Sequence, residues 1–329
     1  MMRNFISFVL RCRLENVIAV VFSTLLVILF LTTRLVHAFT FGMLDFAFLL
    51  LPVGVLGVKS LFTLLVASDT DETVDATRYL AGFFRPLLNI ARDWFPFLLL
   101  CACYYSLYSS LIMRVNPHPV DAFLAKIDQF ILGQPVSLRL QPLIRPWLTD
   151  FLYLIYFSHV VFFPSVALYF YLKKEQKAFR RLMMGFLTIM VLGIASYILI
   201  PAAGPEAFYA SQYTLDLSGH ALMQSVDYIF RTGHVSYDCF PSLHVGIPCL
   251  LALYLRDYRR RLFIPVLVYV ACMCLATVYL RYHYLIDVIA AFAYAPAAYW
   301  LNDVLLRHWP AEQAGQPAAT IATATPSGS

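Results

Sequence analysis

The sequence predicts an all-α fold, a polytopic transmembrane helical bundle of about eight spans. Of its 329 residues, 61% are hydrophobic and only 13% are charged, and the mean hydropathy is +0.72. A soluble globular domain is usually about 45–50% apolar and about 25% charged. The composition therefore excludes a water-soluble enzyme, a collagen-like chain and a disordered chain. The net charge of +5 comes from short basic clusters, which do not indicate a nucleic-acid partner.

Apolar runs long enough to cross a bilayer define the expected spans. A membrane helix needs about 20 mostly apolar residues. Such runs occur near 15–35, 39–67, 94–113, 151–172, 182–200, 241–256, 262–281 and 283–303. The first run follows three arginines and has no A-x-A cleavage site, so we expect an uncleaved anchor. The run 241–256 is the shortest of the eight.

Lysine and arginine in short loops predict the orientation of the spans. The segments 173–181 (KKEQKAFRR) and 256–261 (RDYRRR) are strongly basic, and we expect both in the cytoplasm together with the two termini. Eight spans then place the loop 68–93 inside and the loops 114–150 and 201–240 outside. We expect one integral membrane domain over 1–303, followed by a disordered tail over 304–329 that is rich in Ala, Thr, Pro and Ser.

Polar residues at the ends of apolar spans indicate where chemistry could occur, because hydrocarbon disfavours them. His283 and Asp287 are four residues apart, and a helix would place them on one face. Asp287 could then accept a hydrogen bond from one imidazole nitrogen, which fixes the tautomer and leaves the other nitrogen as a nucleophile. His244 precedes His283 by 39 residues, about two bilayer passes. The spacing thus predicts that all three side chains converge at the outer surface.

Other polar groups favour structural interpretations. His159 lies inside the span 151–172 and is interpreted as a hydrogen-bonded core histidine. A second His-x-x-x-Asp pattern, His234 to Asp238, lies in a polar loop and is interpreted as a coincidence. Arg231 and His234 could contact a polar headgroup. Because there is no CxxC pair and no cluster with metal-ligand spacing, we expect neither a metal nor another cofactor.

At these residues the sequence resembles the type 2 phosphatidic acid phosphatase and haloperoxidase superfamily. It is most similar to the branch of inositol phosphorylceramide synthases and sphingomyelin synthases. The similar elements are Pro201-Ala-Ala-Gly204-Pro205, Pro241-Ser242-Leu243-His244 and His283-Tyr284-Leu285-Ile286-Asp287. The resemblance covers about 90–303 and implies a catalytic core of about six helices.

The resemblance implies a role for each matching residue. His283 would be the nucleophile that forms a phosphohistidine, Asp287 would orient it, and His244 would be the general acid and base. The donor would be a membrane phospholipid with an inositol-phosphate-like headgroup. The acceptor would be a ceramide-like lipid alcohol. No protein partner is indicated.

The sequence lacks one positively charged residue that the superfamily's phosphatases carry near the nucleophile. Those enzymes carry an arginine six residues before the nucleophile, where this chain has Thr277. Arg281 is the nearest substitute, and it requires a helix that starts near His283. We therefore take Arg281, Ser242 and Gly204 as candidate phosphate-binding residues.

Three functions remain open at this point. The first is a lipid phosphotransferase, and the departure at Thr277 favours it. The second is a lipid phosphate phosphatase, in which water replaces the lipid alcohol. The third is a transporter or a non-catalytic lipid-binding protein. We expect a bacterial inner membrane with the site facing the periplasm, or an organelle membrane with the site facing the lumen.

Overall fold

The computed structural model describes residues 8–10, 12–32, 76–217, 219 and 237–309, and it confirms the all-α fold. Within these residues the only bridge of β type pairs Ala202 with Asp238, and there is no strand. The long helices are α2 (Leu14–Thr32), α4 (Ala76–Val115), α7 (Pro146–Leu172), α8 (Gln176–Leu199), α11 (Leu243–Tyr258), α12 (Arg260–Tyr279) and α13 (Leu285–His308). The shorter ones are α5 (Asp121–Leu132), α6 (Val136–Arg139), η1 (Gln141–Leu143), α9 (Pro205–Phe208) and η2 (Ala210–Gln212).

Five of the described helices are long and apolar enough to cross a membrane: α2, α7, α8, α12 and α13. They match five of the predicted spans. The predicted span 94–113 lies within α4, and the predicted span 39–67 lies outside the described residues. The predicted span 241–256 forms α11, whose 16 residues make a helix of about 24 Å. This helix is shorter than a hydrocarbon core of about 30 Å.

Three predicted boundaries are wrong. The loop predicted over 68–93 is helical from Ala76 onward, because α4 runs for 40 residues. The loop predicted over 114–150 contains α5, a helix of mixed polar and apolar residues that buries Asp128 and exposes Phe130. The segment 304–308, predicted to belong to the tail, is helical, since α13 continues to His308. Hydropathy detects continuous apolar runs, so it misses helices of mixed composition and the polar ends of long ones.

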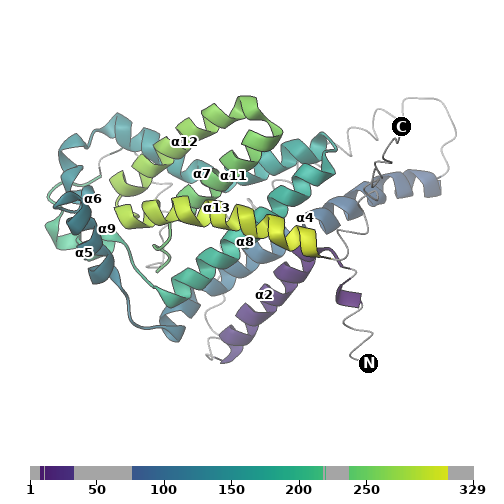
Figure 1. Cartoon of the computed structure of the whole chain (residues 1–329), viewed down its shortest axis with the longest axis horizontal. Coiled ribbons are helices and arrows are strands. Elements are labelled where there is room, and N and C mark those ends of the chain that lie inside the picture. Colours follow the sequence, from purple (N-terminus) through teal and green to yellow (C-terminus); the bar gives the residue numbers. More distant parts are fainter. Residues whose placement is uncertain (1–7, 11, 33–75, 218, 220–236, 310–329) are drawn as a thin grey trace, which may run out of the picture.

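Helix α8 is the centre of the bundle and packs against α2, α4, α7, α11 and α13 (Figure 1). Of its most apolar 18-residue window, 72% is buried inside the protein, against 28% for α7 and 33% for α13. The outer helices instead expose apolar side chains such as Leu154, Val268 and Phe292. This pattern is expected of helices whose outer faces contact lipid.

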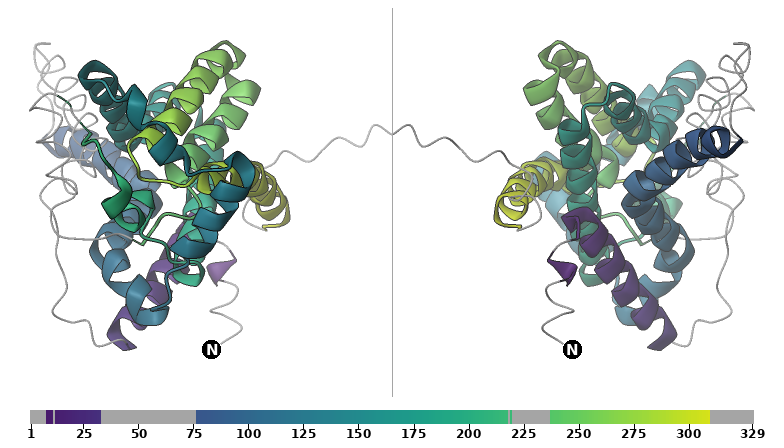
Figure 2. Two further views of the ribbon diagram at one scale, coloured as in Figure 1. Left: turned by 90° about the vertical axis from the view of Figure 1, so that its left-hand side faces the viewer. Right: turned by 90° about the vertical axis from the view of Figure 1, so that its right-hand side faces the viewer.

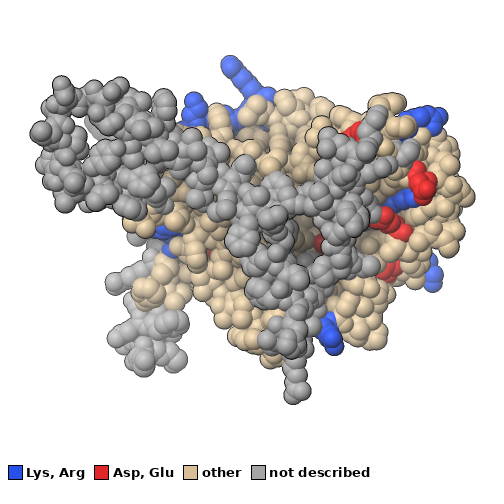
Figure 3. All heavy atoms as spheres, turned by 180° about the vertical axis from the view of Figure 1, so that it is seen from behind, with Lys and Arg blue, Asp and Glu red and all other residues tan. Residues whose placement is uncertain are grey.

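The two ends of the bundle differ in their polar content. At one end, Arg13 contacts Asp93 at 2.7 Å and Arg180 contacts Glu15 at 2.8 Å, and α8 begins while α11 and α13 end. At the other end lie α5, α6 and α9, which face the viewer in the left view of Figure 2. Figure 3 shows a mostly uncharged surface with its visible acidic side chains toward this second end. The N-termini of α11 and α13 also lie there.

Close approach of α8 to α11 depends on a glycine. A Cβ atom at Gly185 would overlap the ring of Tyr254, at 2.7 Å from Cε2. Tyr254 is fully buried and cannot move aside easily. Small residues at such crossings let membrane helices pack backbone to backbone.

We therefore expect Gly185→Val to destabilise the fold by about 1–3 kcal/mol, because overpacking forces helices apart. Ala293→Val, which adds bulk to an exposed position on α13, is the matched control and should have little effect. Thermal unfolding in detergent measures both. Equal unfolding temperatures for the two variants would contradict the packing derived for Gly185.

Candidate active site

The turn between α12 and α13 presents His283. The carbonyl of Thr277 accepts hydrogen bonds from the backbone N–H groups of Tyr282 (3.0 Å) and His283 (3.1 Å), which holds the turn. Helix α13 begins only at Leu285. The prediction that His283 and Asp287 share one helix face is therefore wrong, since His283 precedes the helix.

Asp287 reaches His283 by capping the helix. Its Oδ2 accepts the backbone N–H of Tyr284 at 2.7 Å, as the acidic member of a capping box. The same oxygen lies 3.4 Å from Nδ1 of His283. The contact expected from the spacing is thus present, although it comes from the cap and not from a helical turn.

The second histidine faces the first across the site. His244 lies in the first turn of α11, and its Nδ1 is 3.4 Å from Nε2 of His283. On its other side, Nδ1 of His283 is 2.8 Å from the backbone carbonyl oxygen of Cys239. The structure therefore brings His244, His283 and Asp287 together, and it adds Cys239 to them.

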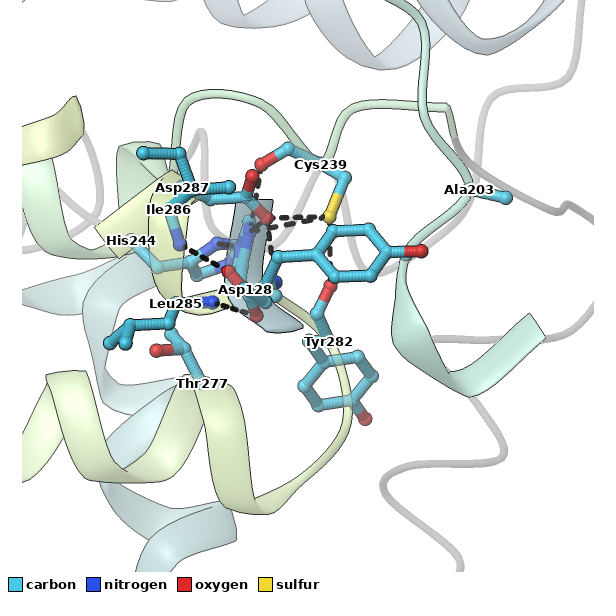
Figure 4. A network of polar contacts seen from close by, with 12 residues as sticks. Asp128, Ala203, Cys239, His244, Thr277, Tyr282, Leu285, Ile286 and Asp287 are labelled. Atoms are coloured by element: carbon cyan, nitrogen blue, oxygen red, sulfur yellow. Dashed lines mark hydrogen bonds and ion pairs between the residues drawn. The ribbon is translucent and has the colours of Figure 1, made fainter. Parts of the chain in front are cut away.

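Cys239 is a site residue that sequence reasoning missed. Its buried thiol donates to Oδ2 of Asp287 at 2.9 Å, and its carbonyl accepts from His283 (Figure 4). Burial, together with the negative charge of Asp287, raises the pKa of this thiol well above its usual range. The one available signal was that Cys239 is the only cysteine of the chain in a polar loop.

Cys239, His283 and Asp287 also form a possible metal-ligand set, because one donor atom from each lies within 4.8 Å of the others. A thiolate, an imidazole and a carboxylate are typical zinc ligands. In this structure, however, Nδ1 of His283 faces a carbonyl oxygen at hydrogen-bond distance, so it carries a proton and offers no lone pair. We interpret the three residues as a hydrogen-bonded network.

Two buried carboxylates from α5 hold the segments that carry the site. Asp128 accepts the backbone N–H groups of Leu285 (2.7 Å) and Ile286 (2.9 Å), which are the first of α13. Asp121 accepts the N–H groups of Ala203 (3.0 Å) and Gly204 (2.8 Å) and the hydroxyl of Tyr284 (2.9 Å). Burial raises the pKa of Asp128, and its two backbone hydrogen bonds oppose that shift. Sequence reasoning missed both carboxylates because it placed them in a loop.

Gly204, a candidate phosphate-binding residue, is bound to a carboxylate of the protein. Its N–H already donates to Asp121, so it is not offered to a phosphate. Its φ is +93°, and a Cβ atom there would lie 2.7 Å from the carbonyl oxygen of Tyr282. A glycine is needed at this position for the close approach of two backbones.

Of the other two candidate phosphate-binding residues, Ser242 lies near the histidines and Arg281 contacts other residues. The Arg281 guanidinium lies over the ring of Tyr213, at 3.8 Å from its centroid, and donates to the carbonyl of Leu215. Burial lowers the pKa of Arg281. The contacts described for Arg281 include neither His244 nor His283. Ser242, in contrast, is the N-cap residue of α11, next to His244.

His159 contacts the site, contrary to its interpretation as a core residue only. Its ring lies edge-on to the ring of His244, with centroids 4.0 Å apart. Its Nδ1 is 2.7 Å from the carbonyl oxygen of Tyr156, whose own ring stacks on His244 at 4.3 Å. The interpretations given for His234 and Arg231 are not tested, because both residues lie outside the described part of the chain.

A family model described as PAP2 superfamily matches residues 123–301, more than half of the 329-residue chain. The match includes Asp128, the site loop and both histidines. No curated protein and no solved structure matches the chain.

We expect Asp128→Ala to destabilise the fold, because two partly buried N–H groups at the start of α13 lose their acceptor. An unsatisfied buried donor costs about 1–3 kcal/mol. Gln129→Ala, at the next and exposed position of α5, should change the unfolding free energy by less than about 0.5 kcal/mol. Chemical unfolding in mixed micelles measures both variants. If they proved equally stable, Asp128 would not hold α13.

We also expect the Cys239 thiol to react with iodoacetamide at pH 8 more than about tenfold slower than Cys12, because a raised pKa and burial leave little thiolate. Mass spectrometry of variants that keep one of these two cysteines gives the rates. Unfolding with denaturant should make the rates similar. Fast labelling of Cys239 in the folded protein would show that the thiol is not buried against Asp287.

Proposed function

The chain belongs to the PAP2 superfamily, which indicates an enzyme of phosphatase or phosphotransferase type, and from that premise we propose a membrane-embedded lipid phosphotransferase. It would move a phosphate-bearing, inositol-phosphate-like headgroup from a phospholipid to a lipid alcohol. The observation that carries this proposal is the orientation of His283. One of its ring nitrogens is held by Cys239 and Asp287, and the other faces His244.

His283 would act as the nucleophile through Nε2. The carbonyl of Cys239 requires a proton on Nδ1, which leaves the lone pair on Nε2. Attack of Nε2 on phosphorus would form the N–P bond of a phosphohistidine and break the P–O bond to the diacylglycerol part of the donor. Asp287, fully buried and 3.4 Å from Nδ1, would stabilise the positive charge that develops on the ring.

His244 would transfer the protons. As a general acid it would protonate the oxygen of the leaving alcohol. As a general base it would then remove the proton of the acceptor hydroxyl, whose oxygen attacks phosphorus while the N–P bond breaks. Only 3.4 Å separates the facing nitrogens of His244 and His283, and a reacting phosphorus alone needs about 3–3.5 Å from the nucleophile. Substrate binding must therefore move the two rings apart.

The start of α11 would supply positive character for the phosphate oxygens. A helix N-terminus offers unpaired N–H groups and the positive end of the helix dipole. Ser242 caps this helix, is fully buried, and has an Oγ without a hydrogen-bond partner among the described residues. We propose Ser242 and the N–H groups of His244 and Val245 as the phosphate cradle, because the backbone of Leu243 already bonds to Tyr197. Arg281, held against Tyr213, would contact the headgroup side.

We propose that the site lies on the extracytoplasmic side of the membrane. In a bacterial inner membrane this is the periplasmic side. Arg13, Arg180, Arg181 and Arg259 all lie at the opposite end of the bundle, in ion pairs. An excess of basic residues typically marks the cytoplasmic side.

We expect His283→Ala to abolish headgroup transfer, and His244→Ala to reduce it by about 10²–10⁴-fold, the range of a general acid–base group. His308→Ala changes an exposed histidine at the other end of α13 and should leave activity unchanged. The assay uses purified protein in lipid micelles with phosphate-labelled phospholipids, with and without ceramide or diacylglycerol.

The assay also separates the alternatives. Label that moves to a lipid product only when a lipid alcohol is present supports the transferase. Inorganic phosphate released from a phosphomonoester lipid without an acceptor would identify a phosphatase instead. Full activity of His283→Ala would refute the shared mechanism.

A further inference from the structure

A pocket that opens to solvent lies between α4, α7, α8 and α11. Most of its lining is apolar and comes from the middle of these helices, for example Phe97, Phe163, Phe186 and Met190. His244 lines the same pocket, so the pocket is continuous with the proposed reaction centre. An apolar pocket between membrane helices suits a hydrocarbon chain.

The lining of the pocket also includes polar groups. Asp238 accepts a hydrogen bond from the hydroxyl of Tyr104 at 2.8 Å, and both residues line the pocket. His159 lines it too, next to His244. The pocket is therefore amphipathic, because hydrogen-bonding groups and apolar side chains line the same space.

The charge of the lining distinguishes between the two substrates of a transferase. No lysine or arginine belongs to the described lining, and the one ionisable acid is Asp238. A carboxylate accepts hydrogen bonds from hydroxyl or amide donors, and it repels a phosphate group. The pocket thus disfavours the anionic headgroup of a phospholipid donor and favours a neutral lipid with a donor group at its polar end.

We propose that this pocket is the acceptor site and binds a neutral lipid alcohol. One hydrocarbon chain would lie between Phe163, Phe186 and Met190, and Asp238 would bind a hydroxyl or amide hydrogen at the polar end. The reacting hydroxyl would then be next to His244, which takes its proton as the oxygen bonds to phosphorus. This assignment rests on the proposed phosphotransferase function and names where its second substrate binds.

Binding can be tested without any activity. A long-chain alcohol that carries a photoreactive diazirine in its chain is irradiated with the full chain in lipid micelles, and the cross-linked peptides are identified by mass spectrometry. We expect cross-links on α7 and α8 near Phe163 and Met190. Excess ceramide or diacylglycerol should suppress them, and the more effective competitor indicates the acceptor class. Cross-links suppressed only by phospholipid, or none in these helices, would overturn the proposal.

Kinetics give a second readout. Met190→Trp fills the pocket, and we expect the apparent KM for the lipid alcohol to rise about tenfold with less than a twofold change for the donor. Asp238→Asn should shift the same constant in the same direction. Phe292→Trp, on the exposed face of α13, is the control and should leave both constants unchanged. Equal effects on donor and acceptor would overturn the assignment.

If no transfer occurs while the cross-links form, the proposed function fails and the binding site stands.

Discussion

The site depends on the two buried carboxylates of α5 more than on any other contact. Asp128 caps the start of α13, and Asp121 holds the backbone of Ala203 and Gly204 together with the Tyr284 hydroxyl. The two carboxylates are buried, and hydrogen bonds to buried carboxylates are strong and costly to break. They connect three segments that are far apart in the chain. Without them, the turn that presents His283 would lose its connection to α5.

A chain of hydrogen bonds passes from this anchor to the reactive imidazole. Tyr284 connects Asp121 to the capping carboxylate of Asp287, and Asp287 contacts both Cys239 and His283. Each group limits the orientation of the next one. Because the ring of His283 is held on its Nδ1 side, its Nε2 side is directed toward His244 before any substrate arrives. Such preorganisation avoids reorientation of polar groups during a reaction.

Part of the fold and of the site could be predicted from local signals. Apolar runs located the spans that became α2, α7, α8, α12 and α13, since membrane helices need only length and hydropathy to be recognised. The separation of His244 and His283 by two passes predicted that they would meet. The same signals missed α5 and the role of Cys239, because a 12-residue helix of mixed composition and a lone thiol have no distinctive pattern.

The sequence by itself determined that this chain is a helical membrane protein and which histidines come together, because hydrophobic periodicity and span length are local properties. The tertiary structure decided what holds those histidines. It placed His283 in a turn instead of a helix, directed Arg281 toward Tyr213, and brought His159 against His244. These outcomes depend on long-range packing and on which buried donor meets which acceptor, and no spacing along one chain specifies such partners.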